Sequence, residues 1–258
     1  MVEGLLRPFL TGVFLEPDLA TSRRFLDLVL RTFVRASPCL PALGMQEIPR
    51  QLASGLPANV VQLDSPAVAV SATAVTTKEA TVKARAVVVA TDPTTAARLL
   101  PALTQPRMNS VTTWYHSTDD LALADGRPIL HLDNERRGPV VNSVVVSHAA
   151  PAYAPQGRVL VSSSTLGTQV DADTERRVLD QLARMYGRST KGWDMVAVYP
   201  IPHALPSMLP PHDFRRPVRL DDGLYLAGDH RDSSSIQGAM VSGRRTAQSV
   251  IADLGASR

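Results

Sequence analysis

The sequence contains a single cysteine, Cys39, among its 258 residues. One cysteine cannot form an internal disulfide and is typical of a reducing compartment, so we expect a cytoplasmic protein. No apolar run approaches the roughly 20 residues that a membrane-spanning helix needs. The first residues, Met1 to Thr11, contain neither a basic leader nor a small-residue cleavage site, so secretion is not predicted.

Several kinds of chemical site are also missing. The six histidines are dispersed without metal-ligand spacing, so no metal site is predicted. None of the lysines (Lys78, Lys83 and Lys191) stands in a glycine-rich loop, and no G-x-S-x-G turn is present, which disfavours a P-loop protein and a hydrolase. The arginines are scattered and the net charge is only +3, so nucleic-acid binding is not predicted.

Helical and strand patterns alternate along the chain. The apolar fraction of 44% and charged fraction of 20% are ordinary for a globular protein of one large or two small domains. Apolar spacing and capping residues predict helices over residues 21–35, 45–54, 171–186 and 235–254, and one beginning at Asp92-Pro93. Short β-rich runs between turn residues predict strands over residues 60–63, 67–75, 81–90, 111–115, 129–132, 140–147, 159–163, 193–199 and 224–227.

Two of these elements carry further expectations. The continuously apolar run Ala86–Ala90 predicts a strand that is buried on both faces. The helix predicted over residues 21–35 has one apolar stripe, and arginines lie on its other faces. Such a stripe usually packs on a core, but a basic amphipathic helix can also lie on a membrane surface, so peripheral membrane contact stays open.

The segment Leu224–Leu254 combines a short apolar strand, a Gly228-Asp229 turn, a loop of small polar residues and a helix. The N–H groups and dipole of a helix N-terminus favour an anion or an electron-rich ring edge. Gly228 permits close backbone approach, and an ionised Asp229 can accept hydrogen bonds from sugar-like hydroxyls. Small residues spaced by four predict a smooth ridge that packs on the sheet: Ala239, Gly243 and Ala247. Both nucleotide binding and an ordinary strand-turn-helix fit this pattern.

The residues Leu-Tyr-Leu-Ala-Gly-Asp at 224–229 and Ser-Ile-Gln-Gly-Ala-Met-Val-Ser-Gly at 235–243 decide between them. They resemble the second FAD-binding signature of the phytoene desaturase, protoporphyrinogen oxidase and amine oxidase superfamily. In that family the Gly-Asp pair contacts the ribityl-pyrophosphate part of FAD, and the start of the helix faces the flavin ring. The resemblance implies these cofactor-binding residues: Gly228, Asp229, Ile236, Gln237, Gly238, Ala239 and Met240.

Other segments share the resemblance, which covers nearly the whole chain. Leu63–Val70 is similar to the family's strand beside the adenosine of FAD and implicates Val68. Ala86–Pro93 resembles the strand that re-enters the cofactor domain and implicates Ala90 and Thr91. Pro200–Pro206 is similar to the proline-bounded segment between substrate domain and flavin.

The resemblance implies an α/β (α+β) fold with a partial FAD-binding domain and a β-rich mixed-sheet substrate domain flanked by helices. We predict substrate-domain helices over residues 1–60 and strands of the partial FAD-binding domain over residues 61–105. The substrate domain, an antiparallel sheet plus a helix, should occupy residues 106–205, and the carboxyl-terminal FAD-binding segment residues 206–258.

The family begins with a strand, a G-x-G-x-x-G turn and a helix that holds the FAD pyrophosphate. None of the fifteen glycines forms that pattern. We therefore expect the carboxyl-terminal portion of an FAD-dependent oxidoreductase that binds FAD weakly or not at all alone and is inactive alone. Apolar surface should be exposed on the strand at 87–89 and on the last helix, which predicts self-association or a partner chain carrying the amino-terminal half. The alternative is a non-catalytic binding or assembly module derived from the same fold.

The chemistry that the resemblance implies is hydride transfer from a small, apolar substrate to FAD. The cofactor carries this reaction, so no catalytic residue is assigned. Substrate-side candidates are aromatic or polar residues of the β-rich layer, although ordinary sheet packing also explains them: Trp114, Tyr115, His116 and Tyr199. Apolar side chains of the first helices can line a tunnel for a lipid-like substrate or pack in the core: Leu6, Phe9, Phe14 and Phe25.

Overall fold

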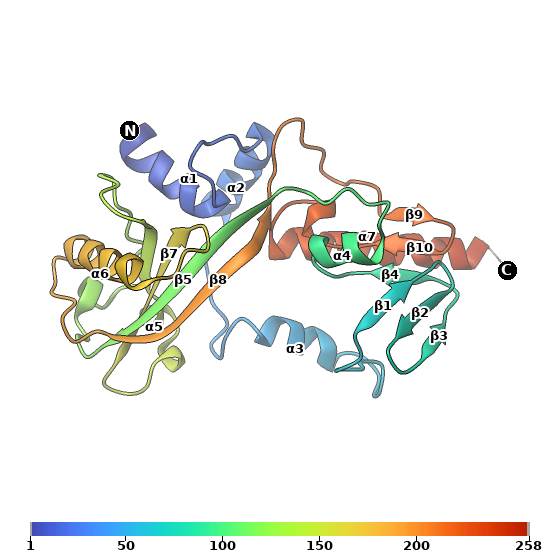
Figure 1. Cartoon of the computed structure of the whole chain (residues 1–258), viewed down its shortest axis with the longest axis horizontal. Coiled ribbons are helices and arrows are strands. Elements are labelled where there is room, and N and C mark those ends of the chain that lie inside the picture. Colours follow the sequence, from blue (N-terminus) through green and yellow to red (C-terminus); the bar gives the residue numbers. More distant parts are fainter. Residues whose placement is uncertain (1, 257–258) are drawn as a thin grey trace. The chain divides into compact units, whose positions relative to one another are not determined.

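Two units make up the part of the chain that the computed structural model describes, residues 2–256 (Figure 1). Unit 1 comprises residues 2–20, 29–57 and 109–204, and unit 2 comprises residues 21–28, 58–108 and 205–256. Both units combine helices with sheets, so the mixed α/β fold class predicted from the sequence is confirmed. Within residues 2–256, no helix has the length and apolarity needed to cross a membrane.

Unit 1 is built on a four-stranded sheet with the order β6-β7-β5-β8. β5 (Met108–Thr118) and β6 (Val140–Val145) both pair antiparallel with β7 (Val159–Leu166), as the sequence predicted for this region. β8 (Asp194–Pro206) lies at the edge of the sheet and runs well beyond the strand predicted over residues 193–199. Its edge position explains how a strand can contain three prolines, which cannot donate hydrogen bonds to a neighbouring strand: Pro200, Pro202 and Pro206.

One face of this sheet is covered by α6 (Ala172–Tyr186). Val178 and Leu182 of α6 pack with Trp114 and Val140 in a buried cluster. Alternate residues of β7 are buried, which is the period of a strand with one covered face: Val159, Val161, Ser163 and Thr165.

Local signals in the sequence set both ends of α6. The Asp171 carboxylate accepts a hydrogen bond from the N–H of Thr174 at 2.7 Å, which caps the first turn. Gly187 follows the last turn in the left-handed conformation, with φ 61°. The predicted helix over residues 171–186 is therefore confirmed.

The other helices of unit 1 are short. They are η1 (Val2–Leu6), α1 (Arg7–Phe14), α3 (Glu47–Ser54), η2 (Leu123–Gly126), α5 (Val146–Ala149) and η3 (Pro151–Tyr153). α1 lies against β6, and a Cβ on Gly12 would come within 2.2 Å of the Asn142 side chain. Asn109 of β5 also donates a hydrogen bond to the carbonyl of Phe14 at 2.8 Å, so α1 contacts both β6 and β5.

The basic amphipathic helix α2 (Arg23–Arg35) crosses the boundary between the units at residues 28 and 29. The predicted helix is confirmed, but of its apolar stripe only Phe25 is buried. Phe33 contacts Phe9 of α1 edge to face, with ring centroids 5.4 Å apart. Of the residues considered for a lipid tunnel, Phe14 and Phe25 are packed in buried positions.

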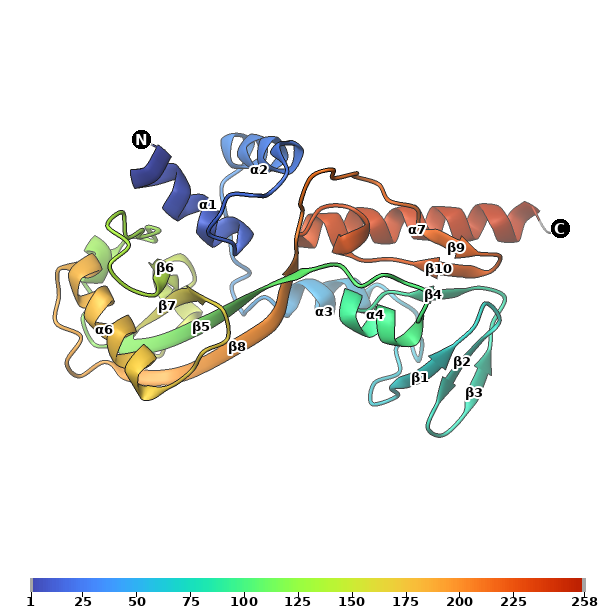
Figure 2. The same cartoon turned by 45° about the horizontal axis from the view of Figure 1, so that its top comes forward.

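Unit 2 contains two three-stranded sheets. β1 (Ala67–Val70), β2 (Ala74–Thr77) and β3 (Thr81–Lys83) form an antiparallel meander. In the other sheet β10 (Leu224–Leu226) lies between β4 (Val87–Val89), which is parallel to it, and β9 (Arg219–Asp221), which is antiparallel. α4 (Pro93–Leu99), η4 (Asp229–Arg231) and α7 (Ile236–Ala256) complete the unit, and Figure 2 shows α7 running alongside β9 and β10.

Several predicted strands need correction. Residues 60–63 form no strand, and residues 129–132 contribute only an isolated bridge between His131 and Ser143. Residues 67–75 are split by a turn into β1 and β2, and residues 81–90 are divided into β3 and β4. β-branched composition favours an extended backbone, but a strand also needs a neighbour to pair with, which composition does not show.

β4 is also less buried than predicted. Val87 and Val89 are buried, whereas Val88 is 41% exposed. β4 is the end strand of its sheet and is covered on one face only, which is why an entirely apolar run does not have two buried faces here.

Candidate functional site

The carboxyl ends of β4 and β10 lie side by side in unit 2. The two strands are paired in parallel with Leu226 opposite Val89, and the N–H of Ala227 donates to the carbonyl of Val89 at 2.9 Å. The residues after β4, Ala90 and Thr91, therefore stand at the same edge as those after β10, Gly228 and Asp229. This edge is where ligands bind to parallel α/β sheets. The structure thus brings these four predicted cofactor-binding residues together.

The turn after β10 requires its glycine. Gly228 has φ 153°, and a Cβ at this position would lie 2.5 Å from the ring of His230. The N–H of Gly228 donates to the hydroxyl of Ser242 on α7 at 3.1 Å. The turn is therefore held by the helix that follows it in the chain.

His230 also belongs to this site, although the sequence did not predict it. Its ring is buried, and neither ring nitrogen has a hydrogen-bond partner among residues 2–256. Its Nδ1 lies 3.8 Å from the carboxylate of Asp229. Buried polar groups are normally satisfied, so an unpaired one beside a candidate ligand edge is consistent with a ligand or water there. Its position directly after the Gly-Asp pair was the available signal.

The start of α7 is fixed by the serine loop before it. Ser235 accepts hydrogen bonds from the N–H groups of Gly238 and Ala239, through its hydroxyl at 3.0 Å and its carbonyl at 2.9 Å. The first N–H groups of a helix have no partner within it, so those of Ile236 and Gln237 remain for a ligand. The side chains at the start of α7 that face solvent are Ile236, Gln237, Ala239 and Met240.

The face that α7 buries differs from the predicted one. Ala239 and Ala247 are exposed, and the buried small residues are Gly238, Ser242 and Thr246. Thr246 donates to the carbonyl of Ser242 at 2.9 Å and also approaches that of Leu226 at 3.4 Å. The buried face of α7 therefore differs from the predicted face by one residue, which is a rotation of about 100°. The reason is that the hydroxyl-bearing face of the helix contacts the polar backbone at the end of β10.

Two groups of predicted residues belong to elements other than those that form this edge. Val68 belongs to β1, whose Ala67 and Val70 pack against the core of Val89 and Leu226, while the side chain of Val68 is exposed. The substrate-side candidates all belong to unit 1.

β5 and β8 divide the substrate-side candidates into two environments. Trp114 and His116 are buried, and the indole N–H of Trp114 donates to Thr165 at 3.0 Å. Tyr115 and Tyr199 are less buried and contact each other edge to face, with ring centroids 6.0 Å apart. The side chains that a substrate can reach are therefore the two tyrosines.

No cluster of His, Cys, Asp and Glu suited to a metal ion occurs among residues 2–256.

Arg245 of α7 connects the two loops that contain Arg216 and Asp232. It donates to the carbonyl of Arg216 at 2.8 Å and to the carboxylate of Asp232 at 3.2 Å, and both charged side chains are largely buried. Arg245→Gln is expected to lower the free energy of unfolding by about 2 kcal/mol, because it leaves Asp232 without its charge partner. Arg244→Gln, at the exposed neighbouring position, should change it by less than about 0.5 kcal/mol. Urea unfolding measures both, and equal effects would refute this role for Arg245.

Comparison with known proteins places the chain in a family. The profile of the flavin containing amine oxidoreductase family matches residues 1–251. No curated protein matches the chain.

Solved structures share the fold. A protein from Exiguobacterium sp. 255-15, described as a candidate protoporphyrinogen oxidase, is 17% identical with a TM-score of 0.70; the match covers 98% of this chain and 64% of that one. Reduced UDP-galactopyranose mutase is 14% identical with a TM-score of 0.63, over 87% of this chain and 58% of that one. An oxidoreductase from Methanosarcina mazei is 14% identical with a TM-score of 0.52, over 71% and 48%.

The chain thus spans less than two thirds of the length of each of these structures. The family match extends over nearly all of the residues, and the similar structures have the same fold. The chain therefore belongs to the flavin containing amine oxidoreductase family, as the resemblance of its carboxyl-terminal signature implied.

Proposed function

We propose that this chain forms the carboxyl-terminal part of a flavin-dependent oxidoreductase and supplies one side of its FAD site. The observation that carries the proposal is the convergence of the ends of β4 and β10 with the start of α7 at the Gly228-Asp229 turn. FAD, when bound, accepts a hydride from a substrate C–H bond. The protein residues bind and orient the cofactor.

The groups at this edge suit FAD. Asp229 can accept hydrogen bonds from the hydroxyls of the ribityl chain, and the first N–H groups of α7 can donate to the ring edge or a phosphate. Gly228 keeps the turn free of a side chain, and the unpaired ring nitrogens of His230 lie directly behind it. Ile236 and Met240 offer exposed apolar contacts, and Ala90 and Thr91 complete the edge.

The glycine turn that holds the pyrophosphate in this family is not among these 258 residues. We propose that it is supplied by residues outside them, and that FAD binding by this chain alone is weak. The sheet offers a place for such residues, since β4 is an end strand and Val88 is 41% exposed. Apolar side chains of α7 are exposed too, with Ile251 at 71%, so a partner segment or a second copy would cover both surfaces.

For the substrate we propose a small, apolar molecule that contacts Tyr115 and Tyr199. Trp114 and His116 alternate with Tyr115 along β5 and are buried, so they would support these contacts from behind. The two tyrosine rings supply an apolar surface with polar tips.

Titration of the chain with FAD, followed by flavin fluorescence, tests the cofactor site. The purified chain should carry no stoichiometric flavin, and Asp229→Ala should weaken the FAD affinity by roughly tenfold through loss of charged hydrogen bonds. Asp222→Ala is the matched control, because this exposed aspartate precedes β10 whereas Asp229 follows it. Equal affinities of the two variants would refute the proposed site. No fluorescence change at millimolar FAD would favour the alternative, a non-catalytic assembly module.

A further inference from the structure

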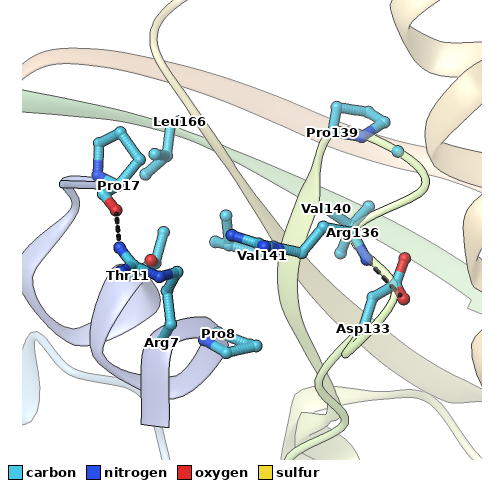
Figure 3. A pocket seen from close by; sticks show the side chains of 11 residues that line it. Arg7, Pro8, Thr11, Pro17, Asp133, Arg136, Pro139, Val140, Val141 and Leu166 are labelled. Carbon is cyan, nitrogen blue, oxygen red and sulfur yellow. Dashed lines mark hydrogen bonds between the residues drawn. The ribbon is translucent and has the colours of Figure 1, made fainter. Parts of the chain in front are cut away.

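A cavity of about 330 Å³ lies in unit 1 between α1, the segment 133–141 and the end of β7 (Figure 3). Its apolar lining comes from Pro8, Pro17, Pro139, Val140, Val141 and Leu166. Arg7, Thr11, Asp133 and Arg136 supply its polar groups. The cavity shares no residue with the proposed cofactor edge or with the substrate-side candidates, and Val140 of its lining packs with Trp114.

Two guanidinium groups of this cavity share one carboxylate. Arg7 donates from Nε and Nη2 to the two oxygens of Glu3, at 2.8 and 3.1 Å, and from Nη1 to the carbonyl of Pro17 at 3.0 Å. Arg136 approaches the same Glu3 carboxylate at 3.6 Å. Figure 3 shows the side chain of Arg136 reaching across from the side of Asp133 toward α1. Two guanidinium groups therefore share the Glu3 carboxylate, and Asp18 and Glu16 also act electrostatically on Arg7.

Asp133 also lines the cavity, and its carboxylate is held by hydrogen bonds from uncharged amide groups. Its carboxylate accepts the backbone N–H groups of Glu135, Arg136 and Arg137, at 3.0 to 3.2 Å. It also accepts the side-chain amide of Gln181 at 2.7 Å. Through these four hydrogen bonds, Asp133 stabilises the loop that carries Arg136.

The walls of the cavity are fixed before any ligand arrives. Gln181 is fully buried and exchanges hydrogen bonds with the backbone N–H and carbonyl of Val140, at 2.7 and 2.9 Å. Gly138 makes this possible, since a Cβ there would lie 2.2 Å from the Gln181 oxygen. On the other wall, Gly12 packs closely on Asn142. Such preorganisation lowers the conformational entropy that the protein loses when a ligand binds.

We propose that this cavity binds a small organic carboxylate with an apolar body, whose carboxylate replaces that of Glu3 between Arg7 and Arg136. Glu3 demonstrates the geometry, because both of its oxygens meet the planar fork of Arg7 as a ligand carboxylate would. The apolar lining then takes the body of the ligand. The volume and the few convergent polar groups are those of small-molecule sites.

Binding of 3-phenylpropionate and hexanoate to the full chain, followed by NMR shifts of the backbone amides, tests this inference. Both probes should bind saturably and shift the amides of Thr11 and Val141, whereas hexanol, which has no carboxylate, should bind at least about tenfold more weakly. Inorganic phosphate at equal concentration should not displace them.

Three variants make the test specific. Arg136→Gln should weaken binding by about tenfold. Arg137→Gln removes the same charge from the next residue, which is 65% exposed against 57% for Arg136 and does not line the cavity, and it should bind like the wild type. Glu3→Gln removes the competing carboxylate and should tighten binding several-fold, a gain that misfolding cannot produce.

The opposite results would overturn the proposal. Absence of saturable binding of both carboxylates, equal binding of hexanol, or displacement by phosphate would each show that no organic carboxylate site exists here. Equal effects of Arg136→Gln and Arg137→Gln, or unchanged affinity in Glu3→Gln, would place any binding elsewhere.

Discussion

Replacement of Gly238 by alanine is expected to lower the free energy of unfolding by about 3 kcal/mol, because the added methyl group has no space. A Cβ at this position would lie 1.9 Å from the carbonyl oxygen of Ser233 and 2.6 Å from its hydroxyl. Ser233 is itself buried, so the loop cannot move aside without breaking the contacts between Ser235 and the start of α7. The substitution should therefore disturb the turn at Gly228 as well.

Gly243→Ala is the matched control, since it places the same methyl group five residues further along α7. A Cβ at Gly243 meets nothing within 4 Å. Alanine should then stabilise the helix by about 0.5–1 kcal/mol through its higher helix propensity. Chemical denaturation of both variants measures the two changes. Destabilisation of the same size in both would show that α7 is sensitive to any side chain on this stretch.

Gly238 also shows what a sequence motif can and cannot predict. The pattern of residues 224–243 predicted a strand, a turn and a helix, and only the family resemblance implied a cofactor edge there. The parallel pairing of β4 and β10 places Ala90, Thr91, Gly228 and Asp229 at one edge. The contact of Gly238 with Ser233 depends on how the loop folds back, which no local pattern encodes. For the same reason the buried face of α7 was predicted one residue away from where it lies.

Strands were harder to predict than helices. The helix α6 has both of its end signals within a few residues, at Asp171 and Gly187. Residues 60–63 have the composition of a strand but no neighbour to pair with, and composition alone cannot reveal that. His230 and Arg245 were missed because their roles arise from burial and from contacts with distant segments.

The environment of His116 also depends on tertiary packing, and it predicts a second large effect, on the pH dependence of stability. It stands in β5 beside Trp114, with its ring fully buried and both nitrogens without a hydrogen-bond partner among residues 2–256. Burial disfavours the charged imidazolium and lowers the pKa of His116 from 6.5 to about 4. Because His116 ionises near pH 6.5 when the chain unfolds, acid favours the unfolded state.

The free energy of unfolding should therefore fall by about 3 kcal/mol between pH 6.5 and pH 4 on account of His116 alone. Above pH 6.5 the ring is neutral in both states, and below pH 4 it is charged in both, so the loss is confined to this window. His116→Leu keeps an apolar side chain in the core and should remove this part of the pH dependence. His203→Leu, at an exposed position of β8, should keep the wild-type dependence. Urea unfolding at pH 7, 5.5 and 4.5 separates the variants, and an unchanged slope in His116→Leu would show that other groups set the acid sensitivity.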